Sequence, residues 1–161
     1  MSERNEHCRT ATMHDVKQMM KIRLAVKENR LSDPSMITEK EYEEFMRMQG
    51  RGWVFETFGE IAGFAFVDLS NSSIWALFVH PDQEGKGIGK KLLSEMLDWY
   101  FSHLEKTLWL TTAAETRAEH FYKAAGWIET ARQWKYPKNP ALPPYVELRL
   151  EHRKNAWKEN R

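Results

Sequence analysis

Three alternating glycines in the middle of the chain constrain its fold and chemistry more than any other stretch. Gly85, Gly87 and Gly89 follow the short apolar run Ile74–Val79 and precede a segment with apolar residues at three- and four-residue spacing. That spacing predicts a long helix with one broad apolar face. Glycine permits left-handed turns and close approach of a ligand to the main chain, and a helix start offers unpaired amides. The order of strand, glycine loop and helix therefore predicts an anion cradle suited to a pyrophosphate. The apolar residues of the expected helix are Ile88, Leu92, Leu93, Met96, Leu97, Tyr100 and Leu104.

The residues after the loop exclude two common classes of glycine-loop ligand. The phosphate-binding loop of nucleotide hydrolases needs Lys followed by Ser or Thr, whereas Lys90 and Lys91 follow Gly89. A dinucleotide fingerprint needs a further glycine at position 90, which is Lys. A turn whose glycines serve only backbone geometry stays open as the alternative at this point.

The charge balance argues against a protein that grips nucleic acid through a basic surface. The chain has 24 Lys and Arg against 23 Asp and Glu, a formal net charge of +1, so an anionic ligand must be held locally. Cys8 is the only cysteine, which excludes an intrachain disulfide and a cysteine-based zinc site and fits a reducing compartment. No apolar run approaches the roughly 20 residues of a membrane span, and Met1–Glu6 lack the apolar core of a secretion signal. We therefore expect a cytoplasmic protein without nucleic-acid or membrane partners.

The rest of the chain alternates between strand and helix patterns around one expected core. Thr38 and Glu41 have the spacing of a capping box, which predicts that a helix begins at Thr38. Gly59 favours a hairpin turn, and Gly126 favours a helix C-cap. We expect the apolar run before the glycine loop to be a strand buried on both faces, with a right-handed parallel crossover to the strand after the long helix. The expected strands are 9–12, 53–57, 61–69, 74–79, 108–112, 127–136 and 145–150, and the expected helices are 15–30, 38–49, 88–104 and 117–125.

Two stretches resemble the signatures of one enzyme superfamily. Val79-His80-Pro81 followed by Glu84–Leu93 is similar to the acetyl-coenzyme A loop of the GNAT acyltransferases, whose pattern is Gln or Arg, any, any, Gly, any, Gly or Ala. Thr116–Trp127, with a Phe-Tyr pair and then Gly and an aromatic residue, resembles the second signature. The opening residues Arg9–Thr12, followed by Asp15, resemble the family's first strand and helix, so the resemblance covers nearly the whole chain.

Two positions depart from the family pattern. Glu84 stands where the family has Gln or Arg, with Gln83 one place early. A carboxylate aimed into a pyrophosphate cradle would repel the ligand, so we expect Glu84 to point away. Glu115 stands where the family often has Asn, two residues before Arg117. The resemblance therefore does not assign a polar contact to the pantetheine arm at this position.

The resemblance implies the fold class α/β, or α+β by some schemes. It implies a GNAT-like mixed, mostly antiparallel twisted sheet of about seven strands, with a central parallel βαβ crossover and about four flanking helices. We expect a single acyltransferase domain over residues 1–150 and a polar C-terminal tail over residues 151–161.

The implied function is an N-acetyltransferase that uses acetyl-CoA as cosubstrate. The acetyl group would pass to a primary amine of a small molecule, amino acid or peptide by direct attack in a ternary complex. The alternative is a CoA-binding regulatory or interaction module without turnover, supported by Glu84 and by the lack of a carboxylate in Ile74–Val79. A homodimer is a candidate assembly.

The resemblance also assigns roles at the matching positions. The tyrosine that serves the family as general acid corresponds to Tyr122, whose phenol could protonate the leaving thiolate; the alternative is a tyrosine that only packs its ring. Arg117 is a further cofactor contact or a solvated residue at a helix start. The main chain of Leu77, Phe78 and Val79 would pair with the pantetheine arm like an added strand. The pyrophosphate would meet the amides of Gly85, Lys86, Gly87, Ile88, Gly89 and Lys90.

No single residue stands out as the base that takes the proton from the ammonium of the acceptor. An alkylammonium with a pKa near 10 must lose a proton before it attacks, and a water relay is the expected route. The candidate bases are Glu28, Glu56, Asp68 and His80, each with a solvent-facing charge as the alternative. The six histidines show no ligand spacing with a supporting carboxylate, so we expect no metal site.

Two segments and three aromatic residues are expected to shape the acceptor site. Family substrates lie against the first helix and the loop after it, which points to residues 28–33 and to the region of Pro143 and Pro144. Trp53, Phe55 and Trp75 lie on expected strands that could floor this site. They hint at an apolar or aromatic portion in the substrate.

Overall fold

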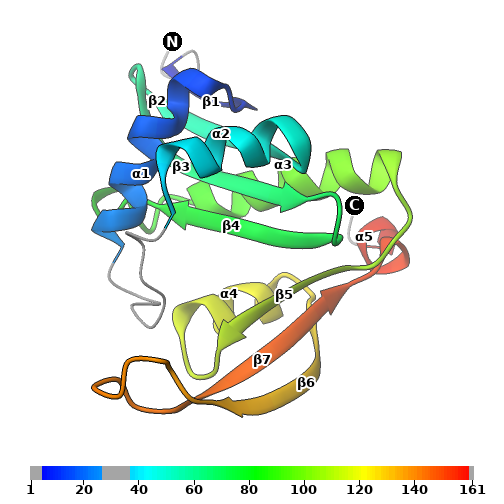
Figure 1. Ribbon diagram of the computed structural model, residues 1–161. Helices are drawn as coiled ribbons and strands as arrows, with labels where there is room; N and C mark the ends of the chain where they lie inside the picture. The colour runs from blue at the N-terminus through cyan, green and yellow to red at the C-terminus, as the bar shows by residue number, and fades with distance from the viewer. Residues whose placement is uncertain (1–4, 27–36, 160–161) are drawn as a thin grey trace. The chain divides into compact units, whose positions relative to one another are not determined.

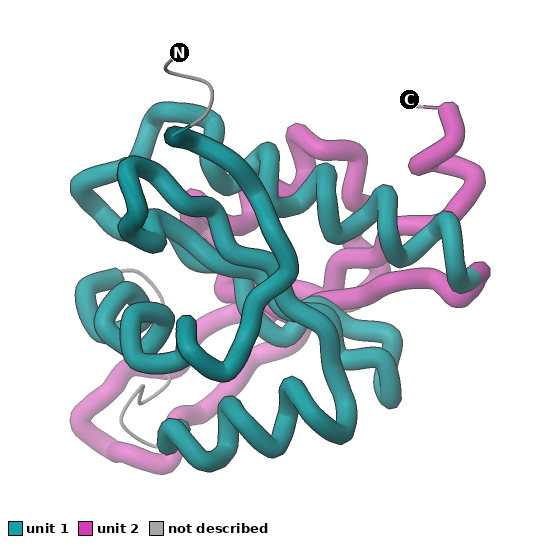
Figure 2. The backbone as a smooth tube through the Cα atoms, turned by 90° about the horizontal axis from the view of Figure 1, so that it is seen from above, with its two compact units in different colours: residues 1–27, 34–104 teal, residues 28–33, 105–161 magenta. Residues whose placement is uncertain are grey.

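The computed structural model describes residues 5–26 and 37–159, and the chain divides into two compact units (Figure 2). Unit 1 spans residues 1–27 and 34–104, and unit 2 spans residues 28–33 and 105–161. Unit 1 contains β1 (Glu6–Thr10), the 3-10 turn η2 (Met13–Asp15), α1 (Val16–Ala25), α2 (Glu39–Met48), β2 (Gly50–Thr57), β3 (Glu60–Asp68), β4 (Ser73–Val79), the 3-10 turn η4 (Pro81–Gln83) and α3 (Ile88–His103). Unit 2 contains β5 (Leu108–Ala113), α4 (Arg117–Ala124), β6 (Ile128–Lys135), β7 (Tyr145–His152) and α5 (Lys154–Glu159).

The sheet of unit 1 is antiparallel in the order β1-β2-β3-β4. Helices α1 and α2 cover one face and α3 covers the other (Figure 1). The expected hairpin between β2 and β3 is confirmed: its two turn residues are Phe58, with φ of 50°, and Gly59, with φ of 79°. Two left-handed residues give the twist that a tight hairpin needs.

Two apolar layers hold this sheet between its helices. The expected apolar face of the helix after the glycine loop is confirmed, except that Leu104 lies just past the end of α3 and is 37% exposed. The buried residues of α3 are Ile88, Leu92, Leu93, Met96, Leu97, Tyr100 and Phe101. The layer under α1 and α2 includes Val16, Met19, Ile22, Tyr42, Phe45, Phe64 and Phe66.

A partly buried ionic cluster lies at the entry to α1. Arg9 donates to both carboxylate oxygens of Asp15 at 2.8 Å and to Glu56 at 2.7 Å. Burial raises the pKa of Asp15, but the hydrogen bonds from Arg9 and from Thr12 outweigh it, so this pKa lies below its usual value. The first strand therefore ends at Thr10 and α1 begins only at Val16, after η2. Residues 27–30 of the expected first helix lie outside the described residues.

The second helix begins as its capping box predicts. The Thr38 hydroxyl accepts a hydrogen bond from the Glu41 amide, and the Glu41 carboxylate accepts one from the Thr38 amide. The helix ends at Met48, and Gly50 already belongs to β2.

Strand β4 differs from the expectation of burial on both faces, because only Ala76 is buried and the other residues of the strand are half-buried. The register explains part of this. Phe66 pairs with Ala76 and Val67 pairs with Ile74, so Trp75 is an extra residue in a β-bulge. An apolar run indicates a strand, but it does not reveal a bulge, which changes the side to which a residue points.

Unit 2 is an antiparallel sheet in the order β5-β7-β6, with α4 packed against β5. Gly126 has φ of 95° and follows the C-cap of α4, as predicted from its position. The C-terminal segment differs from the expected polar tail. Strand β7 runs to His152, and α5 follows with Trp157 only 7% exposed. A single tryptophan in a polar segment is enough to anchor a short helix by burial.

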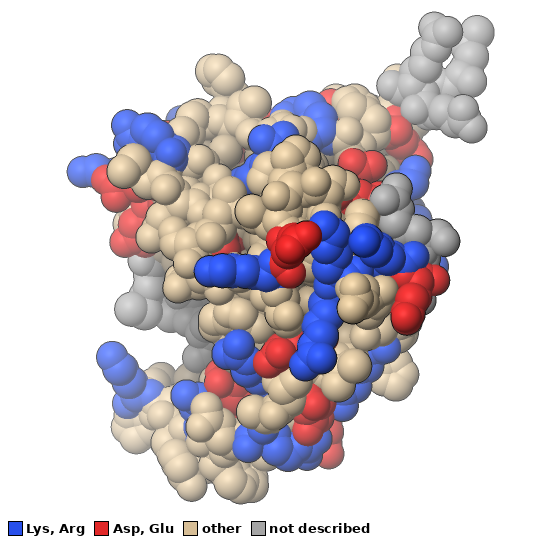
Figure 3. Space-filling model, turned by 90° about the vertical axis from the view of Figure 1, so that its right-hand side faces the viewer, with Lys and Arg blue, Asp and Glu red and all other residues tan. Residues whose placement is uncertain are grey.

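Charged side chains of both signs are interspersed on the face drawn in Figure 3. This distribution agrees with the near-zero net charge of the chain. Among the described residues, no helix combines the length and apolar character that a membrane span requires.

Candidate active site

The glycine loop joins β4 to α3 through two left-handed glycines. Gly85 has φ of 78° and Gly87 has φ of 81°, and a Cβ built on either would meet no atom within 4 Å. Gly87 is also the N-cap of α3. Only glycine adopts this conformation readily, so the local geometry explains why glycine stands at both positions.

The start of α3 directs free main-chain donors toward the loop. The Lys91 amide donates to the Gly87 carbonyl at 3.0 Å, so the amides of Ile88, Gly89 and Lys90 precede the first intrahelical hydrogen bond. No acidic residue lies in the first turn of this 16-residue helix. The helix dipole adds a partial positive charge at the same place. These amides are the groups that the predicted anion cradle would use, and the cradle itself stays a prediction.

Most of the charged side chains around the loop are exposed. The Lys86 ammonium donates to Gln83 at 3.0 Å and is exposed, as is the side chain of Lys90. His80 caps η4, where its Nδ1 accepts a hydrogen bond from the Asp82 amide at 3.0 Å. Glu84 is exposed. The outward direction expected for its carboxylate stays a prediction.

Leu77, Phe78 and Val79 are the last three residues of β4 and lead directly into η4 and the loop. Within unit 1, β4 is the last strand of the sheet and pairs with β3 along one edge. The main chain expected to pair with the pantetheine arm and the amides expected to hold the pyrophosphate are therefore consecutive in one unit.

Helix α4 carries the two candidate residues of unit 2. The hydroxyl of Thr116 caps the helix by accepting from the Glu119 amide at 3.3 Å, and Arg117 is exposed in the first turn. Glu115 has φ of 63°, a left-handed conformation that Asn tolerates better than Glu. Local backbone geometry thus gives a physical reason for Asn at this place in other sequences.

Tyr122 lies deep in an aromatic cluster of unit 2. Its side chain is 6% exposed, and its ring meets those of Phe121 and Trp127 edge to face at centroid distances of 5.1 and 5.3 Å. The Trp127 amide also donates to the Tyr122 carbonyl at 3.0 Å. Burial raises the pKa of the Tyr122 phenol above its usual value, so the phenol is protonated at neutral pH.

His152 also packs against Trp127 in this cluster. The two rings stack at 5.2 Å with an interplanar angle of 25°, and His152 is 3% exposed. Burial lowers the pKa of His152, partly offset by a hydrogen bond with the Gly126 main chain. The neutral imidazole is therefore the favoured form, and its role is to support the indole.

The described candidate bases are already engaged by other groups. Glu56 forms an ion pair with Arg9, and its carboxylate lies 3.3 Å from Nε2 of His7. Asp68 accepts hydrogen bonds from the amides of Ser70 and Asn71 and so closes a turn. His80 serves as the cap of η4, whereas Glu28 and the segment 28–33 lie outside the described residues.

The lone cysteine is unsuited to a covalent step. Burial raises the pKa of the Cys8 thiol to about 11, with a further contribution from Glu95. A thiol with that pKa is protonated at neutral pH and is a weak nucleophile. Among the described residues, no three His, Cys, Asp or Glu side chains gather in a way that could hold a metal ion.

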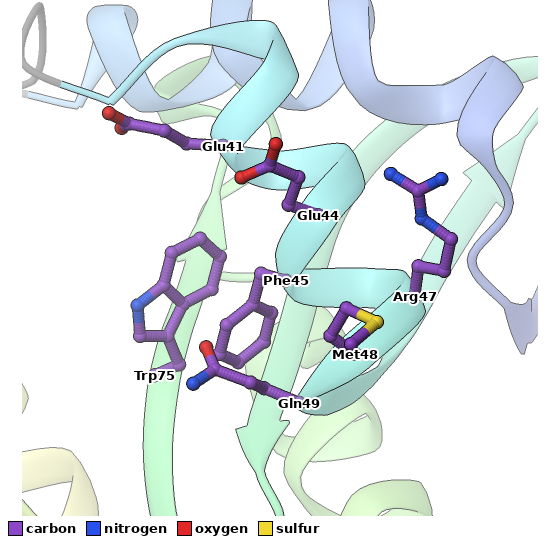
Figure 4. A pocket seen from close by; sticks show the side chains of 7 residues that line it. All are labelled: Glu41, Glu44, Phe45, Arg47, Met48, Gln49 and Trp75. Atoms are coloured by element: carbon purple, nitrogen blue, oxygen red, sulfur yellow. The ribbon is translucent and has the colours of Figure 1, made fainter.

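A pocket in unit 1 contains residues that the sequence analysis did not single out (Figure 4). It has a volume of about 770 Å³ and lies between α2 and β4. Of the three aromatic residues expected to floor an acceptor site, Trp75 lines it, whereas Trp53 and Phe55 are each 4% exposed and belong to the core. The other lining residues are Glu41, Glu44, Phe45, Arg47, Met48 and Gln49.

Solved structures share this fold over nearly all of the chain. The ribosomal-protein-S18-alanine N-acetyltransferase of Escherichia coli has a TM-score of 0.77 at 18% identity, with 92% of this chain and 93% of that chain covered. The putative acetyltransferase yncA of Salmonella typhimurium, solved with its cofactor acetyl-CoA, has a TM-score of 0.71 at 19% identity, covering 93% and 94%. The spermidine/spermine N-acetyltransferase SpeG of Vibrio cholerae has a TM-score of 0.72 at 17% identity, covering 99% of both chains. These likenesses confirm the expected GNAT-like mixed sheet.

Sequence comparison gives a short match and a long one. An uncharacterised N-acetyltransferase, ycf52 of Gracilaria tenuistipitata var. liui, is 33% identical over 58 residues, which is 36% of this chain and 31% of that protein. The profile of the acetyltransferase (GNAT) family matches residues 16–127, which include β4, the glycine loop, α3 and α4. Since this match spans well over half of the chain, the protein belongs to the acetyltransferase (GNAT) family and is an acyltransferase.

Proposed function

We propose that the protein is an N-acetyltransferase that uses acetyl-CoA and a primary amine of a small molecule, amino acid or peptide in a ternary complex. The observation that carries the proposal is the cradle of Gly85 and Gly87 at the start of α3, which follows the half-buried last residues of β4. Its open space, free amides and nearby ammonium groups fit a pyrophosphate. Acetyl-CoA, when bound, supplies an acetyl group activated as a thioester.

We propose that different residues bind different parts of the cofactor. The amides of residues 85–90 would hold the pyrophosphate, and the main chain of Leu77, Phe78 and Val79 would orient the pantetheine arm as an added strand would. Arg117, exposed at the start of α4, is proposed as a further contact to the cofactor.

Tyr122 is proposed as the general acid. When the amine nitrogen forms its bond to the acetyl carbon, the carbon–sulfur bond breaks and the sulfur must take a proton, which the Tyr122 phenol supplies. A raised pKa makes the phenol a weaker acid, but a thiolate formed in equally desolvated surroundings is a stronger base. The acceptor ammonium loses its proton to a water relay, because the described candidate bases are engaged elsewhere.

Direct transfer is favoured over an acyl-enzyme by the environment of Cys8. Its raised pKa leaves little thiolate at neutral pH. A free, unpaired thiol also supports the proposed cytoplasmic location, where thiols stay reduced.

The test is thiol release from acetyl-CoA across a panel of primary amines, with calorimetric titration of CoA in parallel. We expect release that depends on the amine and affinity for CoA in the micromolar range. Affinity for CoA without release for any amine would favour the alternative of a binding module. Loss of both would contradict the cradle itself.

A further inference from the structure

The pocket between α2 and β4 has an aromatic wall built from two distant parts of the chain. Trp75 of β4 stacks on Phe45 of α2 at a centroid distance of 3.9 Å and an angle of 15°, and Tyr42 meets the indole edge to face at 5.2 Å. Phe45 and Tyr42 are buried, whereas Trp75 is half-buried. The indole is therefore the part of this wall that a ligand can reach, as Figure 4 illustrates.

The β-bulge in β4 places Trp75 in this pocket. Trp75 is the extra residue between the pairs Val67–Ile74 and Phe66–Ala76. Trp75, Ala76 and Phe78 all pack against the core under α1 and α2, so the bulge brings Trp75 to the same face as its neighbour Ala76. A bulge next to a functional site commonly re-aims one side chain in this way.

The polar side of the pocket is acidic. Glu41 and Glu44 lie on the face of α2 that looks toward Trp75, whereas Arg47 lies on the flank of that face, away from the indole (Figure 4). The carboxylate of Glu41 is partly engaged by the Thr38 amide at 3.1 Å. Glu44, exposed and nearly one turn further along α2, is the carboxylate best placed to receive an ammonium group.

The pocket also lies near the part of β4 where the pantetheine arm of the cofactor is expected to bind. Trp75 precedes Leu77 by two residues, which corresponds to about 7 Å along a strand. A volume of about 770 Å³ suits a small organic molecule rather than a macromolecule. An aromatic wall beside a carboxylate favours a ligand that is both cationic and apolar. The carboxylate attracts the positive charge, and the face of the indole attracts both the cation and an apolar group.

We propose that this pocket binds the acceptor and selects a primary amine that carries an aromatic group, with Glu44 facing the ammonium and Trp75 facing the ring. The proposal rests on the proposed function for the reaction itself, but the binding of the amine can be measured without turnover. In this proposal Glu44 binds the ammonium group of the acceptor and so helps to select the substrate, and it takes no part in the chemical step.

The probe is 2-phenylethylamine, compared with 1,4-diaminobutane as an aliphatic amine and with 2-phenylethanol as a neutral analogue. The variants are Glu44→Gln, its matched control Glu43→Gln on the same helix outside the pocket, and Trp75→Leu. For Glu44→Gln we expect KM for 2-phenylethylamine to rise about fivefold, the size of one exposed charge pair, with little change in kcat. Glu43→Gln should match the unchanged protein. For Trp75→Leu we expect the preference for the aromatic over the aliphatic amine to disappear.

Calorimetric titration of the same three compounds with CoA present separates this inference from the function. Binding of 2-phenylethylamine that weakens in Glu44→Gln supports the pocket even if no amine is acetylated. Equal binding of the alcohol and the amine, or equal effects of Glu44→Gln and Glu43→Gln, would overturn it. Because Trp75→Leu alters a partly buried side chain, its thermal transition is measured first, and the glutamate pair decides the outcome if that variant unfolds.

Discussion

Tyr122 is buried in the aromatic cluster of unit 2. Its ring is held by Phe121 and Trp127, and its burial raises the pKa of the phenol. The phenol therefore keeps its proton throughout the neutral and mildly alkaline range. Packing alone would explain a buried tyrosine, so only the consequence of removing the hydroxyl distinguishes an acid from a packing residue.

For Tyr122→Phe we expect kcat to fall about a hundredfold, the usual contribution of a general acid, with little change in the affinity for CoA. The ring and its contacts are kept, so the melting temperature should change by no more than a few degrees. Thiol release measured from pH 6.5 to 9.5 should show no decline in the unchanged protein that arises from ionisation of Tyr122, because its pKa is raised.

Tyr136→Phe is the matched control, because Tyr136 is 76% exposed. It should keep its full rate of thiol release. A rate for Tyr122→Phe as high as that of this control would reassign Tyr122 to packing.

The glycine loop and α3 form one continuous element, and we propose that the loop presents the first amides of the helix to the cofactor. The left-handed conformation of Gly87 ends the loop and starts the helix. Gly59, in the hairpin turn between β2 and β3, has nearly the same φ and equally open surroundings. The two glycines therefore have the same left-handed backbone conformation but lie in different parts of the fold.

For Gly87→Ala and Gly59→Ala we expect similar losses of stability, about 1 kcal/mol each, because both force a Cβ into a left-handed conformation. Only Gly87→Ala should weaken the binding of CoA, by about tenfold, since its methyl group would project into the cradle. Thermal denaturation and calorimetric titration of both variants provide the check. Unchanged affinity for CoA in Gly87→Ala would show that the glycines serve backbone geometry alone.

The stability of the folded chain depends on several groups whose protonation differs between the folded and unfolded states. His152 is buried with a lowered pKa, so the unfolded chain binds a proton more readily than the folded chain. Its contribution to stability is complete above pH 6.5 and is lost as the pH falls toward the folded pKa. The lowered pKa values of Asp15 and of Glu129, the latter about 2, act in the same direction at lower pH.

We therefore predict that the free energy of unfolding decreases between pH 7.5 and pH 5.5, before the carboxylates begin to titrate. The variant His152→Leu lacks the buried imidazole, so its free energy of unfolding should depend less on pH. The variant His14→Leu, at an exposed position, should keep the dependence of the unchanged protein. Denaturant titration at the two pH values measures the difference. The same slope in His152→Leu as in the unchanged protein would assign the pH dependence to other groups.

Local patterns in the sequence predicted much of the fold and led to the proposed cofactor site. The glycine loop, the apolar face of α3, the capping box at Thr38 and the cap at Gly126 each depend on residues within a few positions of one another. Such features arise from backbone conformation and helical periodicity, which neighbouring residues dictate. The position of Tyr122 could be named from its Phe-Tyr context, but its burial against Trp127 and His152 could not.

The proposed acceptor pocket shows which features depend on contacts between residues that are far apart in the sequence. Trp75 stacks on Phe45 and lines the same pocket as the two glutamates of α2 because of one extra residue in β4, and an apolar run does not reveal a one-residue bulge. Arg9 likewise meets Glu56 only because β1 pairs with β2. Composition and periodicity describe each element by itself, whereas the partners of a side chain on another element are chosen by register and packing. The sequence alone was therefore sufficient to predict an acetyl-CoA loop, while the residues proposed to face the amine emerged only from the folded chain.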